Sequence, residues 1–230
     1  MNIKPSAYLP VALLLLAVQL GTAQSRWQAG TLPAINLNKG LKNGWSLNTK
    51  WESRQRAAQH RAAGESDTGF DYLLSDFSLI GAKKTGLNNS IAAGYLIRLR
   101  DSRVIHRAIQ QFTLVQRYSR FRLAHRIATD QTFETDALPE FRVRYRIAAE
   151  LPLNGEAADP GEFYLKINHE YLNAFQGREY DLEIRLVPQL GYSFTDRNKL
   201  EAGLDYRIRG FLDQAAEGFY WVTLSWFVKI

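Results

Sequence analysis

The chain has 230 residues, a length that suits one domain, and carries 29 Lys and Arg against 23 Asp and Glu, for a formal net charge of +6. It has no Cys, which excludes a disulfide framework, a thiolate zinc site and acylation on cysteine. The basic residues are spread singly along the chain rather than gathered in a block, so we expect no nucleic-acid partner.

Residues 1–23 have the features of a secretory signal peptide. Lys4 gives a weakly basic start, Leu9 to Leu20 forms an apolar core, and Gly21-Thr22-Ala23 supplies small residues for cleavage before Gln24. The alternative is a membrane anchor, but the apolar run is shorter than the roughly 20 residues that a spanning helix needs. We therefore expect a signal peptide at 1–23 and a single domain at 24–230.

Beyond the leader, the dominant pattern is an alternation of apolar and polar residues. In Phe141–Ile147 every odd position is apolar and every even position is an arginine. Because successive strand side chains point to opposite faces, this segment predicts a strand with one apolar and one cationic face. About eleven such strand-like segments follow one another, although the two faces of 70–82 are mixed; they lie at residues 27–37, 45–54, 70–82, 91–100, 107–118, 120–128, 141–151, 163–171, 180–192, 200–209 and 220–230.

These segments predict an all-β fold, an antiparallel transmembrane β-barrel of about 10–12 strands. Each has roughly the 9–11 residues of a tilted spanning strand. Bacterial single-chain barrels usually have an even number of strands, which favours ten or twelve. Pro33 makes 27–37 the weakest of the eleven segments, and the polar stretches Ala57–Gly69 and Thr129–Leu138 are interpreted as loops.

Alternation alone does not decide which face points inward, since a soluble lipocalin-like barrel has apolar residues inside. Three features favour the membrane arrangement. Ten or more strands enclose more space than aliphatic side chains would fill. Aromatic residues of the apolar face gather near strand ends, where interfacial girdles lie. The apolar row from Tyr220 to Ile230 resembles the C-terminal strand by which outer-membrane barrels are recognised for assembly. We expect the outer membrane as location, with its lipid and the barrel-assembly machinery as partners.

The opposite face supplies both charge signs on neighbouring strands, which predicts a charged lumen crossed by ion pairs, because an unpaired ion in a confined lumen loses hydration. The expected lumen charge network consists of Arg142, Arg144, Arg146, Lys166, Glu170, Asp181, Glu183, Arg185, Glu201, Asp205, Arg207 and Arg209. Such a network would either plug the barrel structurally or leave a narrow, porin-like polar pathway or ligand pocket favouring anions. The sequence names no small-molecule ligand.

Several short motifs resemble one known family. They are Phe141 to Arg146 followed by Leu151-Pro152-Leu153, Asn168-His169-Glu170, Tyr180 to Arg185, the early Trp27, and the stretch from His106 to Gln111. Together they make the chain similar, over most of the mature sequence, to the Bacteroidota family catalogued as domain of unknown function 2490. The resemblance implies an outer-membrane β-barrel whose biochemical role is not established.

Two alternative functions remain open at this point. A lipid-modifying outer-membrane enzyme would use a histidine and a serine on the lipid-facing wall, and His125, His169 and Ser119 share the apolar parity. Ser119 and His125 are six residues apart, about 20 Å in an extended strand, which argues against direct proton transfer. A soluble periplasmic barrel binding an apolar ligand is the second alternative. The four His are scattered, so we expect no metal site and no cofactor.

Overall fold

The computed structural model describes residues 26–61, 64–212 and 216–230. The predicted signal peptide at 1–23 and its cleavage point before Gln24 lie outside the described residues. Nearly all the described chain is β-strand. The strands are β1 (Arg26–Gly40), β2 (Trp45–His60), β3 (Ser66–Lys84), β4 (Asn89–Arg100), β5 (Arg103–Arg117), β6 (Arg122–Phe133), β7 (Glu140–Pro152), β8 (Glu162–Gln176), β9 (Glu179–Thr195), β10 (Asn198–Arg209) and β11 (Glu217–Lys229).

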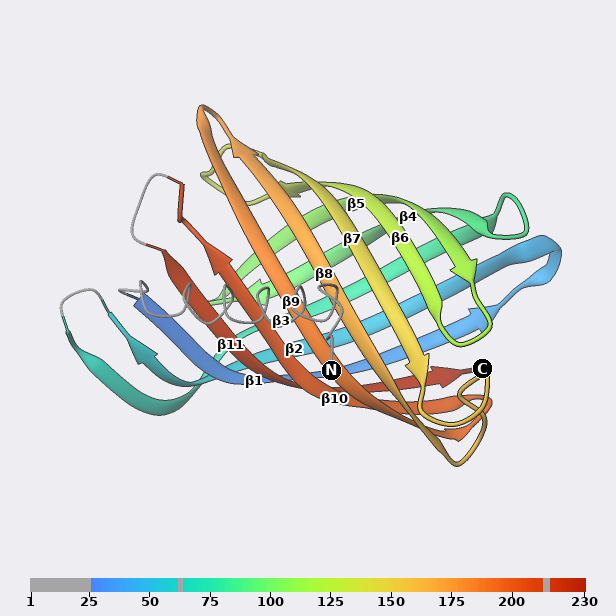
Figure 1. Cartoon of the computed structure of the whole chain (residues 1–230). Coiled ribbons are helices and arrows are strands. Elements are labelled where there is room, and N and C mark those ends of the chain that lie inside the picture. The colour runs from blue at the N-terminus through green and yellow to red at the C-terminus, as the bar shows by residue number, and fades with distance from the viewer. Residues whose placement is uncertain (1–25, 62–63, 213–215) are drawn as a thin grey trace, which may run out of the picture.

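The strands close into one barrel in chain order, with β1 beside β11 (Figure 1). This confirms the predicted fold class, a closed all-β barrel of 10–12 strands. The preference for an even number is wrong, because the barrel has eleven. When neighbouring strands alternate in direction, an odd count leaves the first and last strands pointing the same way. β1 and β11 accordingly pair in parallel, whereas the other neighbours are antiparallel.

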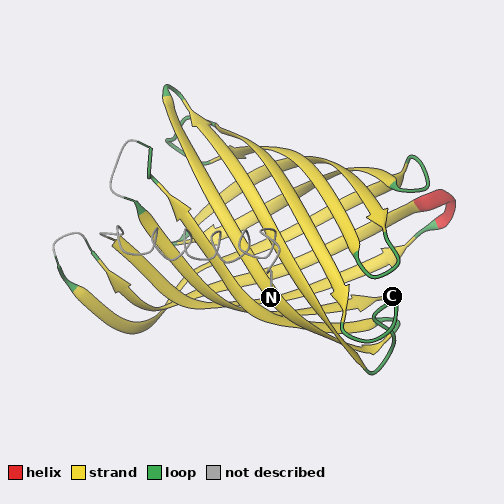
Figure 2. Ribbon diagram, viewed as in Figure 1, coloured by secondary structure: helices red, strands yellow, loops and turns green. Residues whose placement is uncertain are grey.

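The connections between strands that the structure describes in full lie at the two ends of the barrel (Figure 2). A short 3-10 turn, η2 (Lys42–Gly44), joins β1 to β2. No helix among the described residues is long and apolar enough to cross a membrane.

Two predicted loops are largely strand. β2 continues to His60 and β3 begins at Ser66, while β6 continues through Thr129 to Phe133. These polar residues adopt strand conformation, and their side chains form hydrogen bonds with residues of the neighbouring strand. On the outer face of β5 and β6, Thr129 donates to Gln110 at 2.8 Å, and Gln110 and Gln131 bond each other.

The two faces of the wall differ sharply in polarity. In β7, Val143 and Tyr145 are 37% and 39% exposed, whereas Arg142, which precedes them on the opposite face, is only 9% exposed. In the described strands β4 to β11, the positions that alternate with the cavity-lining residues contain no Asp, Glu, Lys or Arg. The apolar face therefore points outward and the charged face points into the barrel.

Outward-facing aromatic rings gather at both ends of the wall. Phe163 and Tyr192 contact each other at one end of the β8–β9 pair, with ring centroids 4.7 Å apart. Phe175 and Tyr180 do so at the other end, with centroids 5.2 Å apart. The apolar band between these rings on the same two strands contains Leu165, Ile167, Ile184, Leu186 and Leu190.

One inward-facing ring fixes the packing of β8 on β9. Tyr164 is 1% exposed and lies over Gly191, where an added Cβ would come 2.2 Å from the ring. We expect Gly191→Ala to destabilise the barrel by about 1–3 kcal/mol, because Tyr164 must move and lose its hydrogen bond to Glu201. Denaturant unfolding checks this. Gly40→Ala is the control, since nothing lies within 4 Å of its added Cβ, and an equal loss in both variants would contradict the packing argument.

Candidate functional site: a charged cavity inside the barrel

A cavity of about 690 Å³ lies inside the barrel and is lined by residues from every strand. Thirteen basic and nine acidic side chains line it, so the lining carries an excess of positive charge. All twelve residues of the lumen charge network named from the sequence are among the lining residues. At one end the lining reaches the rim residues Leu138 and Gln176, and at the other it ends near Lys166 and Phe227.

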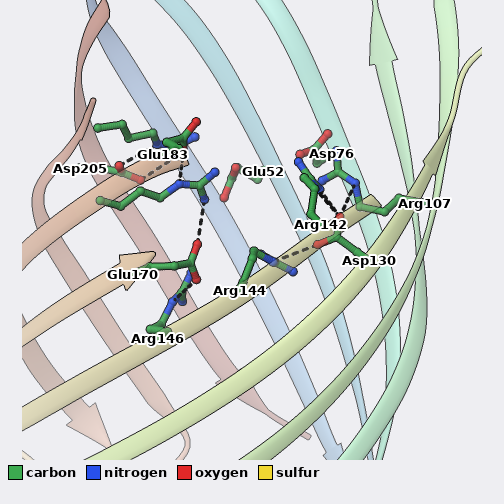
Figure 3. Close-up of polar contacts among 12 residues, drawn as sticks. Glu52, Asp76, Arg107, Asp130, Arg142, Arg144, Arg146, Glu170, Glu183 and Asp205 are labelled. Atoms are coloured by element: carbon green, nitrogen blue, oxygen red, sulfur yellow. Dashed lines mark hydrogen bonds and ion pairs between the residues drawn. The ribbon is translucent and has the colours of Figure 1, made fainter. Parts of the chain in front are cut away.

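The most densely paired acid in the lumen is Asp130 on β6. Its carboxylate is fully buried and lies 3.6 Å from Arg107, 2.5 Å from Arg142 and 2.9 Å from Arg144. These arginines come from β5 and β7, so the cluster connects three neighbouring strands (Figure 3). Strand alternation alone places all four side chains on the inner face.

A second cluster is centred on Glu170 of β8. Its carboxylate lies 2.7 Å from Arg146 and 3.2 Å from Arg185, and Arg185 also bonds Glu183 (Figure 3). The strand register explains the arrangement, because Arg146 lies directly opposite Glu170 and Glu170 lies opposite Arg185. Charges of opposite sign thus alternate around the inner wall from β7 to β9.

The remaining members of the predicted network divide into three arrangements. Arg207 forms two hydrogen bonds of 2.8 Å with Asp205 two residues earlier on the same strand. Lys166 reaches Glu201 at 2.8 Å. The structure does not bring Asp181 and Arg209 into this network: Asp181 accepts from the backbone N–H of Gly210, and Arg209 pairs with Glu217.

Several lumen charges were absent from the predicted network. They are Lys50, Glu52, Arg54, Asp76, Arg98, Arg100, Arg107, Arg126, Asp130, Glu134 and Glu140. For Arg98 the signal was available, since it alternates with apolar residues in β4. Asp130 fell in the stretch interpreted as a loop, and Asp76, which forms a two-pronged pair with Arg98 at 2.7 Å, fell in a segment with mixed faces.

Two lumen arginines have no carboxylate within ion-pair distance among the described residues. Arg126 lies opposite Arg146 and makes one long hydrogen bond, 3.4 Å, to Gln111. Arg54 stacks over the ring of Trp221, with its guanidinium carbon 5.1 Å from the ring centroid. The guanidinium groups of Arg126 and Arg54 can therefore interact with a negatively charged solute in the cavity.

The residues considered for catalysis are not assembled into a catalytic group. His125 is hydrogen-bonded to the Tyr145 hydroxyl at 2.8 Å, and Ser119 lies in the turn between β5 and β6. His169 packs edge-on against Tyr171. Neither of these histidines bonds a serine within the described chain.

A different pair, His60 and Ser66, is hydrogen-bonded at 3.0 Å across the β2–β3 ladder. His60 also stacks on the ring of Trp27, which does not orient a base as a carboxylate does. Within the described ranges, no group of three His, Asp or Glu residues could hold a metal ion.

Comparison with known protein families identifies a family for this chain. The family model described as "Protein of unknown function (DUF2490)" matches residues 29–211, which include most of β1, all of β2 to β10 and most of the cavity lining. No curated protein and no solved structure matched significantly. The match extends over more than half of the chain, and the protein therefore belongs to the DUF2490 family.

Proposed function

We propose that the protein is a β-barrel of the outer membrane that spans the lipid with its apolar outer wall and encloses a narrow polar lumen favouring anions. The observation that carries the proposal is the inverted polarity of the wall. The outer positions of β4 to β11 hold no charged side chain, while the cavity inside is lined by charges. This is the arrangement typical of barrels that face lipid outside and water inside.

The aromatic pairs at both ends of the β8–β9 wall support the same orientation. Tyrosine and other aromatic side chains gather at the two membrane–water interfaces, where their polar groups reach water and their rings reach lipid. A soluble barrel carrying an apolar ligand would need the opposite arrangement, and the charged lining gives that alternative no support.

The positive excess of the lining supports a preference for anions. Rings and rows of Arg and Lys favour anions in pores because they lower the electrostatic energy of a negative ion inside. Arg126 is the cation best placed for this, since its one hydrogen bond among the described residues goes to the neutral side chain of Gln111.

Planar-bilayer recording tests the proposal on the purified full chain. We expect small discrete openings whose reversal potential in a salt gradient indicates anion preference. Arg126→Glu should shift that potential toward cations, because it places a carboxylate beside Arg146. Arg120→Glu makes the same charge change in an exposed turn and should leave the potential unchanged. Openings with no selectivity, or an equal shift in both variants, would contradict an anion-favouring lumen.

A structural barrel with a closed lumen is the second candidate. It is favoured by the fact that the pairs at Asp130 and Glu170 join neighbouring strands, as in a reinforced wall. The absence of discrete openings in the same recording would support this candidate over the channel.

A further inference from the structure

Three buried polar atoms without a hydrogen-bond partner in the described chain lie in one region of the inner wall. They are Nε of Arg54, the indole Nε1 of Trp221 and the hydroxyl of Thr223. Trp221 and Thr223 are 1% and 4% exposed. Two of these atoms are donors and the hydroxyl can also donate, so the region has donors in excess of acceptors.

The strand register brings these groups together. Arg54 stacks on the Trp221 ring, and Trp221 and Thr223 leave the same face of β11, two residues apart. Thr223 of β11 pairs with Leu32 of β1. On the other side of β1, the register with β2 places Arg54 beside Leu32. Arg54 and Thr223 both line the cavity, so the region borders the space inside the barrel.

The charges around Arg54 are balanced by other partners. Arg54 is repelled electrostatically by Arg207, Arg98 and Arg185, and it is attracted by Glu52 of its own strand. Each of these three other arginines has its own carboxylate within ion-pair distance, as the pairs described above show. Glu52, the nearest acid along β2, is bonded to Lys50. Within the described chain, Arg54 is therefore the member of this group that has no carboxylate within ion-pair distance.

Arg54 is half-buried, and a cation that loses hydration in a confined lumen without a paired anion is costly, a cost that a bound anion lowers. We propose that the lumen binds a small oxyanion, a carboxylate or phosphate-type group, at Arg54, with the Thr223 hydroxyl as a neutral donor beside it. Arginine suits this role because its planar fork of N–H groups matches two oxygens of such an anion. Trp221 holds the guanidinium in place through the stacked ring. The proposal rests on the polar lumen of the proposed function, but it does not require that the barrel conduct.

Calorimetric titration of the purified full chain in detergent with inorganic phosphate and with acetate tests this site. At constant ionic strength we expect saturable binding of one equivalent by at least one of the two anions. Arg54→Gln should weaken it about tenfold or more, the loss expected for a charge-assisted hydrogen-bonding group. Arg100→Gln removes the same charge from an exposed position lining the same cavity and should keep the original affinity.

Two further variants keep the test decisive. Arg54→Lys retains the charge and loses the fork, so its affinity should lie between those of the original chain and Arg54→Gln. Trp221→Phe leaves a smaller ring beneath the guanidinium, so its affinity should also fall, but by less than that of Arg54→Gln. No saturable binding by either anion, or the same loss in Arg54→Gln and Arg100→Gln, would overturn the site. If the barrel binds the anion but shows no openings in planar-bilayer recording, the anion site is supported and the channel proposal is contradicted.

Discussion

Replacing Asp130 by asparagine is expected to lower the free energy of unfolding by about 3–5 kcal/mol, the range seen when one partner of a buried ion pair is removed. The substitution keeps the volume of the side chain and deletes its charge. Three guanidinium groups, from Arg107, Arg142 and Arg144, would then face one another without the carboxylate that lies between them. Urea unfolding of the barrel in lipid vesicles, followed by tryptophan fluorescence, measures the loss.

Glu134→Gln is the matched control for this prediction. Glu134 pairs with Arg103, whose side chain is 70% exposed at the end of the barrel, so the change should cost less than about 1 kcal/mol. Combining Asp130→Asn with Arg144→Gln should recover part of the loss, because it removes one of the repelling charges. If Asp130→Asn costs no more than Glu134→Gln, the buried cluster contributes no more to stability than an exposed pair.

The wall of the barrel could be predicted from the sequence because it depends on a local rule. In Phe141–Ile147 the alternation of apolar residues with arginine determines both the strand and its two faces. All twelve charges assigned to the lumen from such patterns line the cavity. Inward position follows from parity within one strand and needs no knowledge of the neighbours.

The partners of those charges could not be predicted in the same way. They depend on register, which sets Arg146 opposite Glu170 but leaves Arg126 opposite a second arginine. They also depend on inner-face residues from segments without clear alternation, of which Asp130 is the most connected. The spacing of residues on one strand reveals neither the register nor these additional inner-face residues. The roles of Asp130 and of Arg54 are therefore visible only in the assembled barrel.

The number of strands likewise depends on how the whole sheet closes into a barrel, and no single segment of sequence determines it. Eleven segments were recognisable, but the usual even count argued against accepting all of them. Pro33, which weakened the first segment, lies in β1 where pairing with β2 is interrupted, while its pairing with β11 continues. Pro33 weakened the prediction of a strand at 27–37, yet this strand, β1, pairs with β11 and so closes the barrel.

The outer wall offers the clearest test of the proposed orientation toward lipid. Ile167 lies midway along β8, is 49% exposed, and alternates with the cavity-lining Lys166 and Asn168. We expect Ile167→Arg to lower the free energy of unfolding in phospholipid vesicles by about 2–4 kcal/mol, because the guanidinium would enter the hydrocarbon at mid-depth.

The control for this prediction is an arginine at a position that stays in water. Leu87 is 99% exposed in the turn between β3 and β4, and Leu87→Arg should change the free energy of unfolding by less than about 0.5 kcal/mol. The two substitutions make the same chemical change at exposed leucine-sized side chains, so only the surrounding solvent distinguishes them. Equal small effects in vesicles would mean that water, rather than lipid, surrounds the middle of the wall, and the membrane-spanning proposal would fail.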